Sequence, residues 1–277
     1  MRGKLARTFA VVLGAGCLLG LANLAGAANR GADGEFEERR SSHFVLFQDV
    51  DIDESSGFHG SRRFEQRVLE VLESAYQQLD ARLGLRPDGP ITVMVYDPAV
   101  FQARFTGLFR FPAAGFYRGQ VHVRGDTEVT AALSRVLHHE LVHAAMASEI
   151  SANGLPAWFS EGVAEWFEAR AAGQRKLSTQ QRVFLQHQAR RGGLYSLSEL
   201  SLPAFSGFGP REARTAYLES YGFIAYLAHR YSEPRLREWL REIARTRDIE
   251  RATRRTFRDD LGGLEAGYFA ELEAGGP

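Results

Sequence analysis

The chain has 277 residues, of which 44% are hydrophobic and 25% are charged, and these proportions are typical of a folded globular protein. They exclude a disordered or collagen-like chain, and the balance of 34 basic and 34 acidic residues gives no net charge that would favour nucleic acid. Cys17 is the single cysteine, so neither an internal disulfide nor a cysteine-rich zinc cluster can form. Any metal must therefore be held by histidine and carboxylate side chains.

Residues 1–27 are predicted to be a signal peptide. A basic start precedes a mostly apolar run over 9–24, and Ala25-Gly26-Ala27 offers the small residues that signal cleavage requires. We therefore expect an exported protein, either periplasmic or secreted. Two alternatives would attach it to a membrane: an uncleaved anchor, although the run is short of the ~20 residues that span a bilayer, or lipidation of Cys17.

The sequence after residue 27 predicts a polar linker over 28–42, followed by one α+β domain over residues 43–277. Strands are predicted at 43–47, 91–96 and 115–123, the last of them bent or bulged because of its glycines. Helical spacing of apolar residues predicts a helix over 63–83.

Helical patterns dominate the second half of the chain. Helices are predicted near 128–148, 156–171, 178–190, 211–231, 234–245, 249–257 and 264–272. Strands followed by helices indicate an α+β fold with a small mixed sheet and a mainly helical C-terminal part. We expect two lobes within the domain, with a cleft near 151–155.

The most informative motif is His139-Glu140-Leu141-Val142-His143. Four residues advance a helix by about 400°, so the two imidazoles project from one face and can hold one Zn²⁺, while Glu140 lies about 100° round the helix. Apolar residues just before the motif continue a helical stripe, which would hold the ligands rigidly. The alternative interpretation is two buried, hydrogen-bonded histidines.

A catalytic zinc site usually needs a third protein ligand. Glu161 and Glu165 are candidates, because the 17 residues between His143 and Glu161 allow one helix to end and a second to return. Glu161 and Glu165 are four residues apart and share a helix face, so one can bind zinc while the other accepts the free ring N–H of a ligand histidine. The alternative is a pair of solvated acids on an amphipathic helix.

Two segments, HHELVH at 138–143 and LPAWFSEGVAEW at 155–166, resemble the gluzincin metallopeptidases, most closely their bacterial peptidase MA-like family. The resemblance implies a thermolysin-like catalytic fold and a peptide or protein substrate. It also implies zinc ligands at His139, His143 and Glu161, a general base at Glu140, and a hydrogen-bond partner for a ligand histidine at Glu165.

Residues 217–227 are similar to the helix on which zinc aminopeptidases place a tyrosine that binds the oxyanion. The similarity implies that role for Tyr217, and Tyr221, one turn away, competes for it. The chain lacks the Gly-x-Met-Glu-Asn segment by which those aminopeptidases recognise a free amino terminus, which favours an endopeptidase. The predicted strand over 116–123 could pair with an extended peptide at the edge of the sheet.

The expected activity is zinc-dependent hydrolysis of peptide bonds, in which zinc activates a water molecule and Glu140 accepts its proton. A zinc amidase acting on cell-wall peptides would use the same groups. A third possibility is a zinc-stabilised binding module without catalysis, but an intact Glu140 argues against it. We expect no nucleic-acid partner, because the arginines of 233–260 are interleaved with acidic residues.

Overall fold

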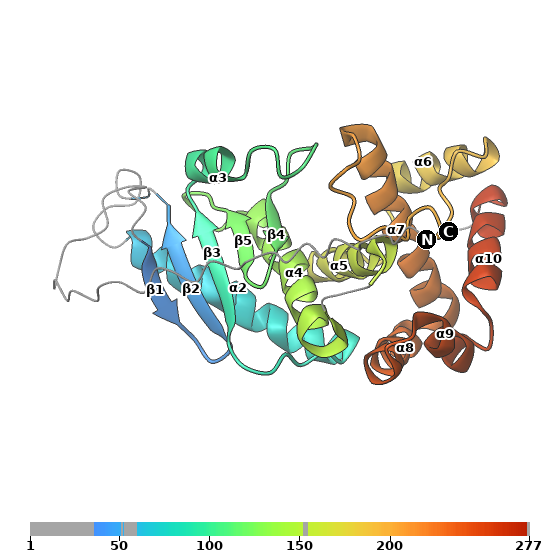
Figure 1. Cartoon of the computed structure of the whole chain (residues 1–277), viewed down its shortest axis with the longest axis horizontal. Coiled ribbons are helices and arrows are strands. Elements are labelled where there is room, and N and C mark those ends of the chain that lie inside the picture. The colour runs from blue at the N-terminus through green and yellow to red at the C-terminus, as the bar shows by residue number, and fades with distance from the viewer. Residues whose placement is uncertain (1–35, 51, 53–59, 152–154, 276–277) are drawn as a thin grey trace, which may run out of the picture.

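The computed structural model of the chain describes residues 36–50, 52, 60–151 and 155–275. It has a five-stranded mixed sheet at one end and helices over the rest of the molecule (Figure 1). The predicted α+β class, with a small mixed sheet and a mainly helical C-terminal part, is confirmed. The predicted signal peptide and Cys17 lie outside the described residues.

The sheet has the strand order β1-β2-β3-β5-β4. Strands β2, β3 and β5 run parallel to one another, and β1 and β4 are antiparallel strands at the two edges. The strand bounds are Glu37–Arg40 for β1, Phe44–Asp49 for β2, Ile91–Tyr96 for β3, Gly115–Tyr117 for β4 and Val121–Arg124 for β5. Alternate residues of β3 are buried, including Val93 and Val95, as expected for β-branched residues on the core face of a strand.

The prediction of a single strand over 115–123 is wrong, because this segment is a hairpin of β4 and β5. The backbone N–H of Arg118 donates to the carbonyl oxygen of Gln120 at 2.9 Å, and Gly119 has a φ of +76°. Glycine adopts this left-handed conformation without strain, so the chain reverses here instead of bending. The reversal makes β4 an edge strand.

Two further elements were not predicted from the sequence. Strand β1 lies within the polar stretch 28–42; it carries no hydrophobic pattern and is held by backbone pairing to β2 and by the contact of Arg39 with Glu65. Helix α3 (Pro98–Phe105) is a short helix whose first turn is fixed by Pro98 and by the Asp97 side chain, which accepts from the N–H of Ala99 at 2.8 Å.

Helices α2 (Gly60–Leu83) and α4 (Ala131–Met146) pack against the sheet and against each other. Apolar residues of α2 are buried at intervals of three or four and form a stripe, for example Val68, Leu72 and Leu79. Gly84 follows the end of this helix with a φ of +71°, a left-handed conformation that glycine adopts without strain. Helix α4 therefore has the sheet and α2 as its support.

Between residues 155 and 275, the described helical part consists of six α-helices, and their ends lie within three residues of the predicted ones. Their bounds are Ala157–Ala171 for α5, Thr179–Arg190 for α6, Pro210–Tyr231 for α7, Glu233–Thr246 for α8, Ile249–Phe257 for α9 and Leu261–Glu273 for α10. A short π-helix, η1 (Ala147–Ser151), continues α4. Within the described part of the chain, no helix has the length and apolarity that crossing a membrane requires.

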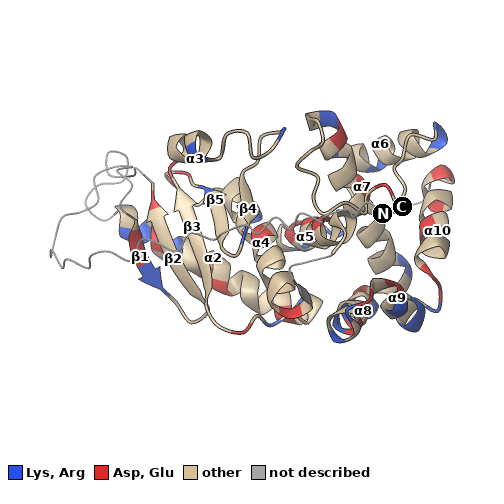
Figure 2. Ribbon diagram, in the orientation of Figure 1, with Lys and Arg blue, Asp and Glu red and all other residues tan. Residues whose placement is uncertain are grey.

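Helix α5 lies in the middle of the molecule, between α4 and α7 (Figure 1). Trp158, Phe159 and Trp166 of this helix are fully buried. At Gly162 the helix approaches α7 so closely that a Cβ placed there would lie 2.5 Å from the carbonyl oxygen of Ser220. Acidic residues of α4 and α5 lie near this centre, whereas α8 and α9 carry basic residues at the periphery (Figure 2).

Candidate active site

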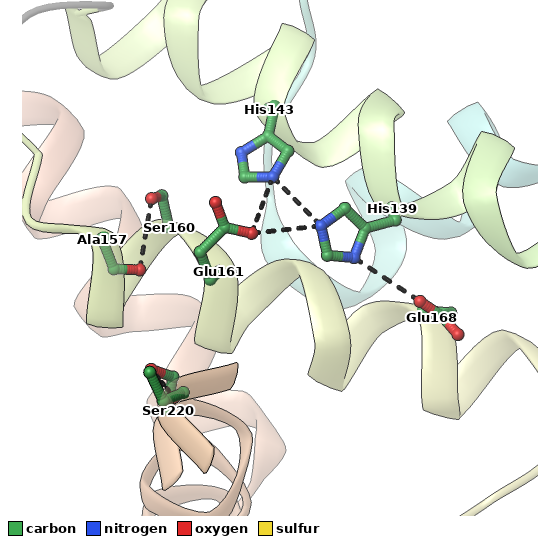
Figure 3. Close-up of polar contacts among 8 residues, drawn as sticks. His139, His143, Ala157, Ser160, Glu161, Glu168 and Ser220 are labelled. Carbon is green, nitrogen blue, oxygen red and sulfur yellow. Dashed lines mark hydrogen bonds and ion pairs between the residues drawn. The ribbon is translucent and has the colours of Figure 1, made fainter. Parts of the chain in front are cut away.

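Two imidazoles of α4 and a carboxylate of α5 converge between these helices (Figure 3). The Nε2 atoms of His139 and His143 lie 3.2 Å and 3.3 Å from Oε2 of Glu161, and they lie 3.2 Å from each other. The spacing of four residues puts the two rings on one face of α4, and α5 supplies the carboxylate opposite them. The structure thus brings together three of the residues that the sequence predicted.

The spacing of these three atoms fits a bound zinc ion. Zinc–nitrogen bonds of about 2.0–2.1 Å in a tetrahedral arrangement place ligand atoms about 3.3 Å apart. The three donors meet this spacing, and two imidazole nitrogens with one carboxylate oxygen suit zinc chemically. Three ligands also leave a fourth position for a reactant.

The charge of Glu161 supports cation binding. Burial of this carboxyl opposes its ionisation, but the facing His143 and His139 outweigh burial and hold the pKa of Glu161 well below its usual range. The carboxylate therefore stays negatively charged over the physiological pH range.

The second ring nitrogen of His139 faces α5 as well. Its Nδ1 lies 3.5 Å from Oε2 of Glu168, and Glu168 also lies 3.4 Å from Nε of Arg135 (Figure 3). A carboxylate in this place fixes the orientation of a ligand histidine and its tautomer. Glu168 was not among the site residues predicted from the sequence, although it lies seven residues after Glu161, two turns along the same face of the helix.

Glu165, which was predicted to contact a ligand histidine, lies in the same group. One of its oxygens is within 4.8 Å of a His139 ring nitrogen and of a Glu168 oxygen. Burial raises the pKa of Glu165 to about 7. In the structure, the direct contact with His139 is made by Glu168, and Glu165 lies beside it.

The predicted general base, Glu140, is buried beside the two histidines. Its Oε2 atom has no hydrogen-bond partner among the described residues, and burial raises the pKa of its carboxyl. Gly115 of β4 packs against it, and a Cβ at Gly115 would lie 3.1 Å from Oε1 of Glu140 and 2.7 Å from Val136. A carboxylate with an unoccupied oxygen and a raised pKa is suited to accept a proton.

His139, Glu140, His143 and Glu161 line a cavity of about 480 Å³, a volume typical of small-ligand sites. Its walls come from the β4 strand and the following turn, from α4 and α5, and from the loops around Phe109 and Ala204. The two loops are joined by Arg110, whose backbone N–H donates to the carbonyl of Ser206 and whose side chain donates to the carbonyl of Gly207, both at 3.3 Å.

The cleft was predicted near 151–155. Residues 152–154 lie outside the described residues, and Leu155 lines this cavity.

Tyr217 of α7 lines the same cavity, with its ring 6.5 Å from that of His139. Burial and the nearby carboxylates Glu161 and Glu140 raise the pKa of Tyr217, so that its hydroxyl keeps the proton it needs as a donor. Tyr221, the competing candidate, is buried and lines a different cavity together with Glu165. Of the two tyrosines, Tyr217 is therefore the one that lines the cavity containing His139, His143 and Glu161.

The fold and the site together define a metallopeptidase-like protein. The family model of the Peptidase MA superfamily matches residues 72–274, a range that includes all of these site residues. The chain belongs to the Peptidase MA superfamily. No curated protein matches the chain. Membership in a peptidase superfamily implies a peptide or protein substrate.

Proposed function

We propose that this protein is an exported zinc endopeptidase. The observation that carries the proposal is the convergence of His139, His143 and Glu161 beside the buried Glu140, all within one cavity. A bound zinc ion would polarise the scissile carbonyl and make the attacking water more acidic. The histidine nitrogens and the Glu161 oxygen are the atoms that would hold it.

The other groups have separate roles in the proposed reaction. Glu140 accepts a proton from the attacking water and returns it to the leaving amine, as its raised pKa favours. Tyr217 donates a hydrogen bond to the oxyanion of the tetrahedral intermediate. Glu168 holds the ring of His139 through Nδ1.

The edge strand β4 supports the choice of a peptide substrate. It pairs with β5 on one side, and its residues Gly115, Phe116 and Tyr117 line the cavity. An extended peptide can add to such an edge through backbone hydrogen bonds that do not depend on its sequence. Such pairing uses backbone groups within the substrate and needs no free terminus, which is compatible with endopeptidase activity.

The proposal is tested by comparing the wild type with Glu140→Gln at equal, measured zinc content on a diverse peptide library. The wild type should cleave, and Glu140→Gln should be slower by a factor of about 10²–10⁴, because a general base typically accelerates a reaction by that factor. Equal rates would remove Glu140 from the mechanism. If the wild type binds zinc but cleaves no peptide, the protein would instead be the zinc-stabilised binding module without catalysis.

Cell-wall muropeptides in the same assay test the amidase alternative, since cleavage of these substrates and no others would favour it.

Export is tested separately. The amino terminus of the mature protein, determined by mass spectrometry after expression in a bacterium, should be Ala28 if residues 1–27 are removed. An amino terminus at Met1 would contradict this part of the proposal.

A further inference from the structure

The cavity has one strongly basic side chain among its described lining residues, Arg118, which follows β4. The charged groups His139, His143, Glu140 and Glu161 are gathered at the metal site, and most of the remaining wall is apolar or small. Arg118 is exposed and forms no ion pair with any other described residue. Its guanidinium is therefore available to a ligand in the cavity.

The backbone holds Arg118 at a defined place. Tyr117 and Val121 form the last pair of the β4–β5 ladder, and the N–H of Arg118 donates to the carbonyl of Gln120 within the turn. Gly119 closes this turn with its positive φ. The base of the Arg118 side chain is thus fixed by the hairpin, and the side chain beyond it can move to meet a partner.

Strand β4 then gives the distance between this cation and the site of cleavage. Gly115, at its first position, packs against Glu140, and Arg118 lies three residues further on. A strand rises about 3.3 Å per residue, so Tyr117, the last residue of β4, lies about 7 Å from Gly115, and Arg118 begins the turn just beyond it. A peptide paired with β4 has the same rise, so Arg118 would lie about three residues from the bond beside Glu140.

We infer that Arg118 selects substrates that carry a carboxylate about three residues from the cleaved bond. This inference rests on the proposed peptidase function. Guanidinium groups bind carboxylates through two parallel charge-assisted hydrogen bonds, and the rest of the wall offers no competing cation among the described residues. The carboxylate belongs to an aspartate or glutamate of the substrate, or to its C-terminus.

The test uses matched fluorogenic peptides that share one cleavable sequence. Aspartate is compared with asparagine at the second, third and fourth residue from the cleaved bond, on either side of it. A peptide with a free C-terminal acid is also compared with its amide. One acidic position should raise kcat/KM by about 5- to 30-fold, mainly through KM, in keeping with a charge-assisted hydrogen bond. Added salt should reduce the preference.

Variants identify the residue responsible. Arg118→Ala should bring the ratio between acidic and neutral peptides close to one, and Arg118→Glu should favour a lysine at the same position. Arg124→Ala is the matched control, because Arg124 is an exposed arginine of the same hairpin that does not line the cavity. It should leave the preference unchanged.

A wild type that cleaves acidic and neutral peptides equally well would overturn the inference while leaving the peptidase proposal intact. So would a preference that persists in Arg118→Ala. Binding of the same peptides to Glu140→Gln, followed by fluorescence anisotropy, decides the role of Arg118 even if no peptide is cleaved. Equal affinity for acidic and neutral peptides in that measurement would also reject it.

Discussion

Gly162→Ala is the substitution that most directly tests how helices α5 and α7 build the site. A Cβ at this position would lie 2.5 Å from the carbonyl oxygen of Ser220 and 2.9 Å from Cγ1 of Ile224. Non-bonded carbon contacts are optimal at about 3.5–4.0 Å, so the helices must separate by about 1 Å. The obstructing oxygen belongs to the backbone and has no rotamer by which to move away.

The separation should cost both stability and activity. Insertion of a methyl group into a packed interior costs about 1–3 kcal/mol. Glu161 is adjacent to Gly162 on α5, and Tyr217 lies on α7 one turn before Ser220. The shift therefore changes the distance between the proposed metal ligand Glu161 and the proposed oxyanion donor Tyr217. A displacement of about 1 Å can reduce the rate about 100-fold.

The assay combines thermal unfolding, zinc affinity and kcat/KM. The control is Gly262→Ala on α10, where the nearest atom to a new Cβ is 3.6 Å away. This control should be neutral or stabilising by up to about 1 kcal/mol, because alanine is the better helix former. Wild-type stability together with wild-type activity in Gly162→Ala would refute the claim that the close approach of α5 and α7 positions the site.

Three further outcomes are expected. Tyr217→Phe should lower kcat by about 100-fold with zinc content unchanged, because it removes one oxyanion donor; unchanged kcat would exclude that role. Burial raises the pKa of Glu219 from 4.5 to about 8, so the folded protein keeps a proton that the unfolded chain releases, and stability should fall by at most about 5 kcal/mol as the pH rises from 4.5 to 8. Glu219→Gln should make the free energy of unfolding, measured with urea across that pH range, decline less steeply than in the wild type. An equally steep decline in the variant would mean that another group causes it. Removal of metal by a chelator should lower the melting temperature, and zinc at about 100 times its Kd should restore about 2.7 kcal/mol, a recovery that Glu161→Gln should lack.

The sequence was sufficient to predict that His139, His143 and Glu161 come together, because helical geometry is local. The spacing of His139 and His143 determines that they share a face, and a return helix bearing Glu161 needs only a turn of suitable length. The contact of Glu168 with His139 depends instead on how α4 and α5 pack over two turns, which no local pattern encodes. Likewise, the sequence left Tyr217 and Tyr221 as competitors, and the rotation of α7 in the fold distinguishes them.

The sheet was harder to predict than the helices. The segment 115–123 contains alternation and glycines that are compatible with one bent strand or with a hairpin, and the positive φ of Gly119 separates the two. Strand β1 has polar residues on both faces, so its pairing with β2 leaves no hydrophobic signal in the sequence. Helix α3 is too short to show a helical spacing of apolar residues. The sequence signals for it are limited to Asp97 and Pro98 at its start.

The link made by Arg110 has a consequence for the form in which a substrate can enter. Residues 97 positions apart in the chain are tied together there, so the strand side and the helix side of the cavity are fastened at their rim. A bulky folded loop would have to break both hydrogen bonds to lie between those sides, whereas a narrow, unfolded length of polypeptide would not. For the proposed peptidase, this arrangement would favour tails, unstructured linkers and already denatured proteins over intact globular ones.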